Sequence, residues 1–443
     1  MDSGSAPVKA ETPFPVLKKA DPAFLALIPP QKPDPSAVYR PSRYAVSVGG
    51  RVYNTLTQQC VQAILPDRAV VGEGYDDLIR QYFLVPEGKD ECAFYLGVLS
   101  LIRALKRKKG CPAYTILPTY ACNARCVYCY EEGRPAAHMA PETVEDVIRF
   151  ILATHAPGTV GLHWFGGEPL LRADIIDRIC LALRERGVPY VSGMVTNGSL
   201  VTPEMADKMA GLWNLRDIQV SMDGCRADHE ARKRFKAPGD HYARIIGSVD
   251  LMSQKGIRVH VRCNVDAENL SGVGAFLEDL AAGIRHRDNV SVYLSPLNEA
   301  RAGEGDVALW ESILAFQDRI RQAGFGREGN HDGRLRTFHC MADRGDVVIC
   351  PDGSLYACEH CPQEARFGDV RHNVTDPDGY RAFCETGMVR EECRSCAYLP
   401  LCTPFAHCPV RDRHCREVKA LTLAAYIASL GQPGEAEAPQ SIC

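Results

Sequence analysis

The chain is organised around one short stretch, Cys122-Asn123-Ala124-Arg125-Cys126-Val127-Tyr128-Cys129. Its three cysteines are separated by three and then two residues, a spacing that can wrap three irons of one 4Fe-4S cluster. The fourth iron would then lack a protein ligand and would be open to a substrate or cofactor. Spacing alone also fits a zinc knuckle or a few buried thiols, so the rest of the chain must decide.

Length and composition predict a globular protein of two or three domains, since the 443 residues are 46% hydrophobic. A net charge of -4 lacks the basic footprint of a nucleic-acid binder, so we expect no nucleic-acid partner. The N-terminus has no secretory signal pattern, and no apolar run reaches the roughly 18 residues of a membrane span. We therefore expect a cytoplasmic protein without a membrane partner. Twenty cysteines in such a chain favour metal or redox sites over disulfides.

The N-terminal part divides into a tail and a small module. Residues 1–42 carry many prolines and few branched apolar side chains, which predicts a disordered tail. Alternating polarity over 44–53 around two glycines predicts a β-hairpin. Helical patterns follow at 75–83 and 91–107. We interpret 43–110 either as a structural cap or as a module that captures a leader peptide by adding a strand to an exposed sheet edge.

Beyond Cys111 the chain alternates strand and helix patterns six times. Strands are expected at 114–117, 160–165, 190–196, 217–221, 258–265 and 290–294. Amphipathic helices are expected at 141–155, 174–186, 203–212, 241–256, 270–282 and 307–323. Consecutive units of this kind build a parallel sheet, and no Gly-rich dinucleotide fingerprint is present. The predicted fold is therefore α/β, a partial (β/α)6 barrel over 111–330 with its site at the carboxyl ends of the strands.

Turn motifs recur where later strands of this barrel end. The second strand runs into Gly166-Gly167-Glu168-Pro169, where the glycines let backbone approach a ligand and the carboxylate can accept hydrogen bonds from an ammonium group. The third strand ends in Thr196-Asn197-Gly198 and the fourth in Ser221-Met222-Asp223-Gly224. Each motif is an ordinary turn by itself. Their order after the cysteine loop is what makes them informative.

The cysteine loop, with its aromatic residue before the last cysteine, and the three strand-end motifs resemble the radical S-adenosylmethionine (SAM) enzymes over roughly residues 111–325. In that family SAM binds the open iron, and reduction of the cluster breaks a sulfonium carbon–sulfur bond to give a 5'-deoxyadenosyl radical. The resemblance implies that the cluster ligands are Cys122, Cys126 and Cys129. It implies SAM contacts from Tyr128, Gly166, Gly167, Glu168, Asn197, Ser221 and Asp223.

One segment departs from the family pattern. Relatives carry a His followed four residues later by an Arg that contacts the SAM carboxylate. Here His229 is followed by a run of three cations, which are Arg232, Lys233 and Arg234. The sequence leaves open which cation has this role, and Arg262 on the fifth strand is another candidate. Taken singly, each is more simply interpreted as a solvated surface charge.

A second dense set of cysteines lies in 331–430 and resembles the SPASM extension of peptide-modifying radical SAM enzymes, which holds two auxiliary 4Fe-4S clusters. The resemblance implies that the first is held by Cys340, Cys350, Cys358 and Cys408. It implies that the second is held by Cys393, Cys396, Cys402 and Cys415. Two departures stand against this assignment. Cys361 competes as a ligand, and five residues separate Cys402 from Cys408, where the family pattern usually has three. Residues 431–443 are expected to form a disordered tail.

The resemblance implies a radical SAM/SPASM peptide maturase, which installs a thioether or carbon–carbon crosslink in a ribosomally made precursor peptide. Its cofactors would be SAM and three 4Fe-4S clusters. Its partners would be a precursor peptide, whose leader binds the winged-helix-like module at 43–110, and an electron donor such as flavodoxin or ferredoxin. The alternatives are an anaerobic sulfatase-maturing enzyme that makes formylglycine and a peptide epimerase. A non-catalytic iron–sulfur electron carrier would keep the cysteines but would not need the Gly-Gly-Glu motif. No catalytic acid or base is assigned.

Overall fold

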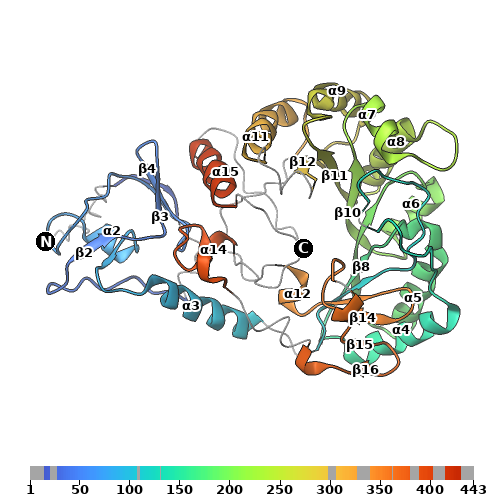
Figure 1. Ribbon diagram of the computed structural model, residues 1–443, viewed down its shortest axis with the longest axis horizontal. Helices are drawn as coiled ribbons and strands as arrows, with labels where there is room; N and C mark the ends of the chain where they lie inside the picture. The colour runs from blue at the N-terminus through green and yellow to red at the C-terminus, as the bar shows by residue number, and fades with distance from the viewer. Residues whose placement is uncertain are drawn as a thin grey trace, which may run out of the picture.

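The molecule has three parts, an N-terminal module, a barrel and a cysteine-rich C-terminal region whose helices lie between them (Figure 1). The computed structural model describes residues 14–19, 27–106, 110–129, 131–297, 306–326, 340–361, 363–379, 389–402 and 415–430. The predicted tail at 431–443 therefore lies outside the described residues.

The N-terminal module is built on small antiparallel sheets. One has the order β1-β5-β4-β3, and β2 pairs with β6 in another. The strands are β1 (Val16–Lys18), β2 (Tyr39–Pro41), β3 (Ala45–Val48), β4 (Arg51–Asn54), β5 (Cys60–Gln62) and β6 (Leu84–Pro86). Its described helices are α2 (Asp76–Arg80) and α3 (Glu91–Lys106). The predicted hairpin is confirmed as β3–β4, and both glycines of its turn have positive φ.

Part of the predicted disordered tail is ordered. Strand β1 pairs with β5 through Val16 and Val61. Ile28 and Tyr39 are buried in two hydrophobic clusters of the module. The prediction of a tail over 1–42 is therefore wrong for these residues, because their apolar side chains complete the core of the module.

The barrel is confirmed as six parallel strands that follow one another in chain order. They are β7 (Ala113–Ile116), β8 (Val160–Trp164), β9 (Tyr190–Thr196), β10 (Leu215–Met222), β11 (Arg258–Val265) and β12 (Val290–Pro296). The predicted helices are α4 (Pro141–Thr154), α5 (Ala173–Glu185), α6 (Pro203–Ala210), α8 (His241–Gln254), α9 (Val273–Gly283) and α11 (Asp306–Gln322). One further helix, α7 (Arg226–Lys233), was missed. It is short and polar, so it gives no strong amphipathic pattern.

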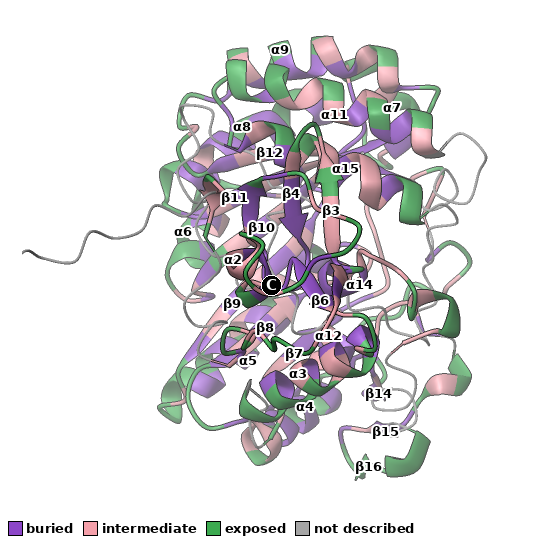
Figure 2. Cartoon of the chain, turned by 90° about the vertical axis from the view of Figure 1, so that its left-hand side faces the viewer, coloured by how far each residue is buried: buried purple, intermediate pink, exposed green. Residues whose placement is uncertain are grey.

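Alternation along each strand separates the core from the barrel interior. On β11, Val259, Val261 and Cys263 are fully buried against the helices. The residues between them, His260 and Arg262, are only partly buried and belong to the other face, which points into the barrel. In Figure 2 purple buried strands lie inside green exposed helical surfaces such as those of α9.

The C-terminal region extends the barrel sheet. Strand β13 (Val347–Ile349) pairs parallel with β7, so ten strands form one sheet. The strands β14 (Ser354–Tyr356), β15 (Gly368–Asp369) and β16 (Asn373–Val374) continue it in antiparallel pairs. The helices of this region are α12 (Met341–Arg344), α14 (Leu399–Cys402) and α15 (Cys415–Ser429). Within the described chain, no helix combines the length and apolar character that a membrane crossing requires.

Candidate active site

The three cysteines of the central stretch lie in the long loop that follows β7, at the carboxyl edge of the parallel sheet. Cys122, Cys126 and Cys129 are partly exposed free thiols. No group of three His, Cys, Asp or Glu side chains among the described residues is placed to hold a single metal ion. A cubane cluster has a separate iron for each thiolate, so its ligands need not meet at one point.

The end of α7 clips this cysteine loop in place. Two backbone amides of the loop donate to carbonyls at the end of α7. Arg125 N donates to the carbonyls of Lys233 and Arg234, both at 3.1 Å, and Val127 N donates to the Arg232 carbonyl at 3.0 Å. In the opposite direction, Lys236 N donates to the Asn123 carbonyl at 2.9 Å. The Lys236 ammonium also donates to the Cys122 carbonyl at 2.6 Å. Arg234 ends α7 with a φ of 47°, which turns the chain toward the loop. These contacts were not predicted, since α7 itself was not predicted.

The glycines of the Gly-Gly-Glu motif clamp the other side of the loop. A Cβ on Gly166 would lie 2.3 Å from the Thr119 carbonyl oxygen, and one on Gly167 would lie 2.4 Å from that of Ala121. Gly166 also has a φ of 119°, a region that favours glycine. We expected these glycines to let backbone approach a ligand. In the structure they let strand β8 approach the backbone of the cysteine loop.

Glu168 is fully buried at the base of this clamp. Its carboxylate accepts hydrogen bonds from Thr196 Oγ1 at 2.7 Å, Asn197 N at 2.9 Å and Leu170 N at 3.1 Å. Burial raises the pKa of Glu168, although these three hydrogen bonds oppose the change. A carboxylate offers about four acceptor positions, so one remains for a further donor such as an ammonium group.

Asn197 connects the end of β9 to the same loop. Its Nδ2 donates to Asn123 Oδ1 at 2.8 Å and lies 4.0 Å from Cys122 Sγ. Its Oδ1 accepts from the backbone and the hydroxyl of Ser199. The motif at the end of β9, the third barrel strand, is therefore in contact with the first cysteine.

Asp223 and Tyr128 form a hydrogen-bonded group above β10 and β11. The Tyr128 hydroxyl donates to Asp223 Oδ1 at 2.5 Å. Asn264 Nδ2 donates to the Tyr128 hydroxyl and to Asp223 Oδ1, both at 3.0 Å. Asn269 Nδ2 donates to the Asp223 carbonyl at 2.8 Å. Sequence reasoning missed both asparagines. Asn264 could have been found, because it lies two residues after Arg262 on the same inward face of β11.

Lys233 is the cation that lies closest to this group. Its side chain is 3% exposed, its Nζ donates to Ser221 Oγ at 2.9 Å, and it lies 3.8 Å from Asp223 Oδ2. Burial by itself would lower the pKa of Lys233, but the negative charge of Asp223 raises it on balance. Lys233 therefore remains an ammonium. The interpretation as a solvated surface charge is wrong here, and Lys233 stands four residues after His229.

The other candidate cations are placed differently. Arg232 is also buried, pairs with Asp266 at 2.7 Å and lies 5.7 Å from the Tyr128 ring centroid, so it too is not a solvated charge. Arg262 is half-buried beside Ser221 in the β10–β11 register. Its Nε is buried without a hydrogen-bond partner among the described residues. Arg234 bonds the carbonyl of its own helix through Nε and does not enter the group.

Two of the four cysteines predicted for the first auxiliary cluster line one cavity. This cavity of about 340 Å³ includes Cys350, Cys358 and Cys361, and Tyr120 of the cysteine loop also lines it. Cys340 is not among the described residues that line it; it precedes α12 and, like Cys358, packs against the barrel core. Cys408 lies outside the described residues. Cys361, the competing ligand, is therefore placed at least as well as Cys340.

The four cysteines predicted for the second auxiliary cluster lie in the C-terminal region, where the other three are close enough to affect the pKa of Cys393. Burial, followed by the charges of neighbours that include Cys402, Cys396 and Cys415, raises the pKa of Cys393 to about 11. None of these four described cysteines forms a disulfide, and Cys415 is exposed at the start of α15. The ligand assignment of both auxiliary sites stays a prediction.

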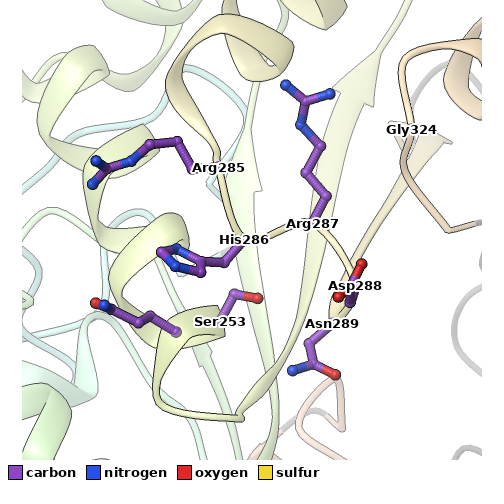
Figure 3. A pocket seen from close by; sticks show the side chains of 8 residues that line it. Ser253, Arg285, His286, Arg287, Asp288, Asn289 and Gly324 are labelled. Carbon is purple, nitrogen blue, oxygen red and sulfur yellow. The ribbon is translucent and has the colours of Figure 1, made fainter.

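A larger cavity of about 500 Å³ lies at the opposite, amino-terminal end of the strands (Figure 3). None of the predicted site residues lines it. His286 and Arg285 bond to Asp250, which fixes the turn between α9 and β12. In barrels of this kind that face supports stability, and the chemistry lies at the other end.

The pattern that defines the Radical SAM superfamily matches residues 116–280. The GTP 3',8-cyclase of Edwardsiella ictaluri is 32% identical over 253 residues, which cover 55% of this chain and 73% of that protein. The chain belongs to the radical SAM superfamily.

Further comparisons place this radical SAM protein beside relatives of several functions. The AdoMet-dependent heme synthase of Methanosarcina barkeri is 22% identical over 315 residues, 64% of this chain and 88% of the relative. The serine-type anaerobic sulfatase-maturating enzyme of Klebsiella aerogenes is 25% identical over 318 residues, 64% and 76% of the two chains. The solved structure of native anSMEcpe with bound AdoMet and Cp18Cys peptide superposes with a TM-score of 0.56 at 17% identity, covering 71% of this chain and 97% of that one. This likeness shows the fold.

The residues of this radical SAM protein fit the cofactors that its superfamily uses. Three free thiols stand in a loop that is fixed on both sides, which suits a cluster with one open iron. Glu168 keeps an acceptor position for the SAM ammonium group. The buried ammonium of Lys233 and the guanidinium of Arg262, whose Nε has no hydrogen-bond partner among the described residues, are positive groups that would suit the SAM carboxylate.

Proposed function

We propose that this protein reductively cleaves SAM to a 5'-deoxyadenosyl radical and uses it to modify a ribosomally synthesised precursor peptide, by forming a thioether or carbon–carbon crosslink. The observation that carries the proposal is the cysteine loop, held between Gly166–Glu168 and the end of α7 at the carboxyl edge of the barrel. When bound there, the cluster and SAM supply the electron transfer and the radical.

In this proposal the residues of the chain bind and orient the cofactors. Cys122, Cys126 and Cys129 hold the cluster. Glu168 accepts hydrogen bonds from the SAM ammonium group, and Lys233 pairs with its carboxylate. The remaining predicted SAM contacts stay as proposed: Tyr128, Gly166, Gly167, Asn197, Ser221, Asp223 and Arg262. A small electron-transfer protein such as flavodoxin or ferredoxin would supply the electron.

Two comparisons support a peptide substrate. One relative is a sulfatase-maturating enzyme, and the barrel resembles that of anSMEcpe, which was solved with a peptide bound. The heme synthase and the GTP cyclase show that the superfamily also acts on other molecules, so the peptide must be tested directly.

The N-terminal module supplies a surface for the leader of such a peptide. Strand β3 lies at an edge of its sheet. Thr55 N donates to the Tyr44 carbonyl, so Tyr44 and Thr55 form a hydrogen-bonded pair. Hydrogen-bonded and non-hydrogen-bonded pairs alternate along an antiparallel ladder, so Ser47, opposite Val52, belongs to a non-hydrogen-bonded pair and its amide points away from β4. Ser47 is exposed. We propose that a leader adds as a strand to this edge, where main-chain hydrogen bonds supply much of the affinity.

The first test is anaerobic reconstitution with reductant and SAM. We expect release of 5'-deoxyadenosine and methionine, and we expect Cys126→Ala to abolish it by removing a cluster ligand. Cys180→Ala is the matched control, because Cys180 is buried in α5 away from the loop. Normal SAM cleavage by the Cys126→Ala variant would show that the central assignment is wrong.

The second test is co-expression with a short peptide encoded beside the gene, followed by mass spectrometry. A crosslink removes two hydrogen atoms from the peptide and leaves no aldehyde. Formylglycine made from serine also removes two hydrogen atoms but reacts with hydrazine reagents, and epimerisation leaves the mass unchanged. An unmodified peptide together with a consumed tetrapyrrole or nucleotide would contradict the peptide assignment.

A further inference from the structure

The N-terminal module rests on the segment that carries the second auxiliary cysteines. The guanidinium of Arg43 donates to the Arg394 carbonyl at 2.7 Å, and the Thr55 hydroxyl donates to the Ala397 carbonyl at 2.7 Å. Arg394 lies between Cys393 and Cys396, and Ala397 follows directly. Both hydrogen bonds therefore depend on the conformation of the peptide that carries two proposed ligands.

Apolar contacts join the same two regions. Leu399 is fully buried in one hydrophobic cluster with Tyr44, Leu56 and Tyr95 of the module. Cys393 and Cys396 pack against that cluster as well. The hydrophobic core of the module thus includes residues of the cysteine segment.

Helix α15, which begins at Cys415, provides the second half of this surface. Its Tyr426 ring packs edge-on against Tyr53 of β4 at 5.9 Å between centroids. The guanidinium of Arg51 donates to the carbonyls of Ile427 at 2.6 Å and Leu430 at 3.1 Å. The other side of α15 packs against α11 of the barrel. Figure 1 shows α14 and α15 between the module and the barrel.

A different contact attaches the far end of the module. Arg103 of α3 forms a buried ion pair with Asp343 of α12, close to where the chain passes into β7. The module therefore has an anchor at the end of α3 and a broad contact with α14 and α15. Release of the second contact alone would leave the module able to pivot about the first.

We infer that the quartet Cys393, Cys396, Cys402 and Cys415 is a metal latch that fixes the orientation of the N-terminal module relative to the barrel. The inference rests on the proposed function and on the prediction that the quartet holds the second auxiliary cluster. Metal binding orders the peptide that supplies its ligands. Here those ligands flank α14 and start α15, the two helices on which the module rests. Cluster occupancy then determines whether a peptide held by the module faces the active site.

The experiment compares hydrogen–deuterium exchange in reconstituted full-length variants. Cys402→Ser/Cys415→Ser removes two ligands, and Cys415 is exposed, so the module core is not altered directly. We expect a loss of about four irons. We also expect exchange in residues 43–56 to become about tenfold faster, while β2 and β6 on the other side of the module keep their protection. Small-angle scattering should show a larger radius of gyration.

Two further variants make the result decisive. Cys358→Ser/Cys361→Ser removes thiols from the other auxiliary site and should leave exchange in 43–56 unchanged. Thr55→Val keeps the iron content but removes one hydrogen bond of the interface, and it should accelerate exchange in the same peptides. Loss of iron from the first variant with unchanged exchange would overturn the latch and leave the cluster assignment intact. Unchanged iron content in the Cys402→Ser/Cys415→Ser variant would overturn both the ligand set and the latch. SAM cleavage by the same protein tests the proposed function of the barrel site separately.

Discussion

Lys233 Nζ lies 3.8 Å from Asp223 Oδ2, and their side chains are 3% and 0% exposed. Asp223 Oδ2 has no hydrogen-bond partner among the described residues, so this ammonium is its nearest compensating charge. The pair connects α7, which clips the cysteine loop, to the end of β10. The two residues therefore combine a structural role with the proposed binding of SAM.

Removal of Lys233 should destabilise the protein and weaken SAM binding. Lys233→Met leaves Asp223 buried without a counter-charge, which typically costs about 3 to 5 kcal/mol. Denaturant titration measures the first effect, and calorimetric SAM titration of the reconstituted protein measures the second. The double variant Asp223→Asn/Lys233→Met should regain much of the stability but not the SAM affinity. A single variant as stable as the wild type would contradict the importance of this pair.

Gly167→Ala should displace the cysteine loop. The added Cβ would meet the carbonyl oxygens of Ala121 at 2.4 Å and Tyr120 at 2.5 Å, well inside van der Waals contact. We expect SAM cleavage to fall by about 5- to 150-fold, since such packing strain usually costs about 1 to 3 kcal/mol. Gly247→Ala in α8 is the matched control, because its Cβ would meet nothing within 4 Å. Equal activity of both variants would argue against the clamp.

Iron content should report three clusters. Eleven predicted ligand cysteines correspond to about twelve irons in the reconstituted wild type. The triple Ala variant of Cys122, Cys126 and Cys129 should retain about eight irons. A wild-type protein with about four irons would rule out both auxiliary clusters.

The choice between Cys340 and Cys361 can be made by the same assay. Because Cys361 lines the cavity with Cys350 and Cys358, Cys361→Ser should reduce the iron content more than Cys340→Ser does. The opposite order would favour the ligand set that the family resemblance implies.

Acid should destabilise the barrel through His229. This side chain is fully buried beside Tyr242, and neither ring nitrogen has a hydrogen-bond partner among the described residues. Burial, reinforced by the charge of Lys233, lowers the pKa of His229 to about 3. The unfolded chain binds the proton first as pH falls below its ordinary value of 6.5, so this stability is lost between pH 6.5 and 3.

His229→Phe keeps the aromatic contact and removes this titration. The loss in free energy of unfolding between pH 7.5 and 5.0 should be about 2 kcal/mol smaller in the variant than in the wild type. Urea titrations at the two pH values measure the difference. An identical pH dependence would show that His229 is accessible to protons in the folded state.

Ser47→Pro should weaken leader binding. Proline removes the outward amide of β3 but is tolerated at a sheet edge. We expect about a tenfold loss of precursor affinity, the value of one lost hydrogen bond of about 1.4 kcal/mol. Ser47→Ala keeps the amide and should bind normally, and SAM cleavage without peptide should be unaffected in both. Fluorescence anisotropy with a labelled precursor measures the affinity. Equal precursor affinities of Ser47→Pro and the wild type would favour the interpretation of the module as a structural cap.

Sequence periodicity predicted the barrel because the signal is local. Strand β9 was predicted at its observed bounds, 190–196, since both its ends carry turn residues. The cysteine loop and the strand-end motifs could likewise be assigned to one site from the sequence, because parallel strands bring their carboxyl ends to one edge of the sheet.

The sequence could not predict what depends on distant partners. Lys233 was interpreted as a surface charge because a cation shows its burial only through its neighbours, here Asp223 and Tyr128. Similarly, the tight packing of Gly167 involves the carbonyl of Ala121, in a loop with no regular secondary structure. Ordered residues before position 42 were missed because Ile28 ends a short apolar run directly before two prolines, and Tyr39 is a single aromatic residue in a proline-rich context.

Strand β13 completes the sheet beside β7, with Val347 opposite Tyr114 and Ile349 opposite Ile116. During translation β7 emerges long before β13, and until then its outer row of amides and carbonyls has no strand to pair with. Unpaired edges of this kind recruit strands from other chains. Recombinant fragments that stop at residue 330 would keep that edge open and should aggregate, so expression of the isolated barrel is a poor route to its chemistry.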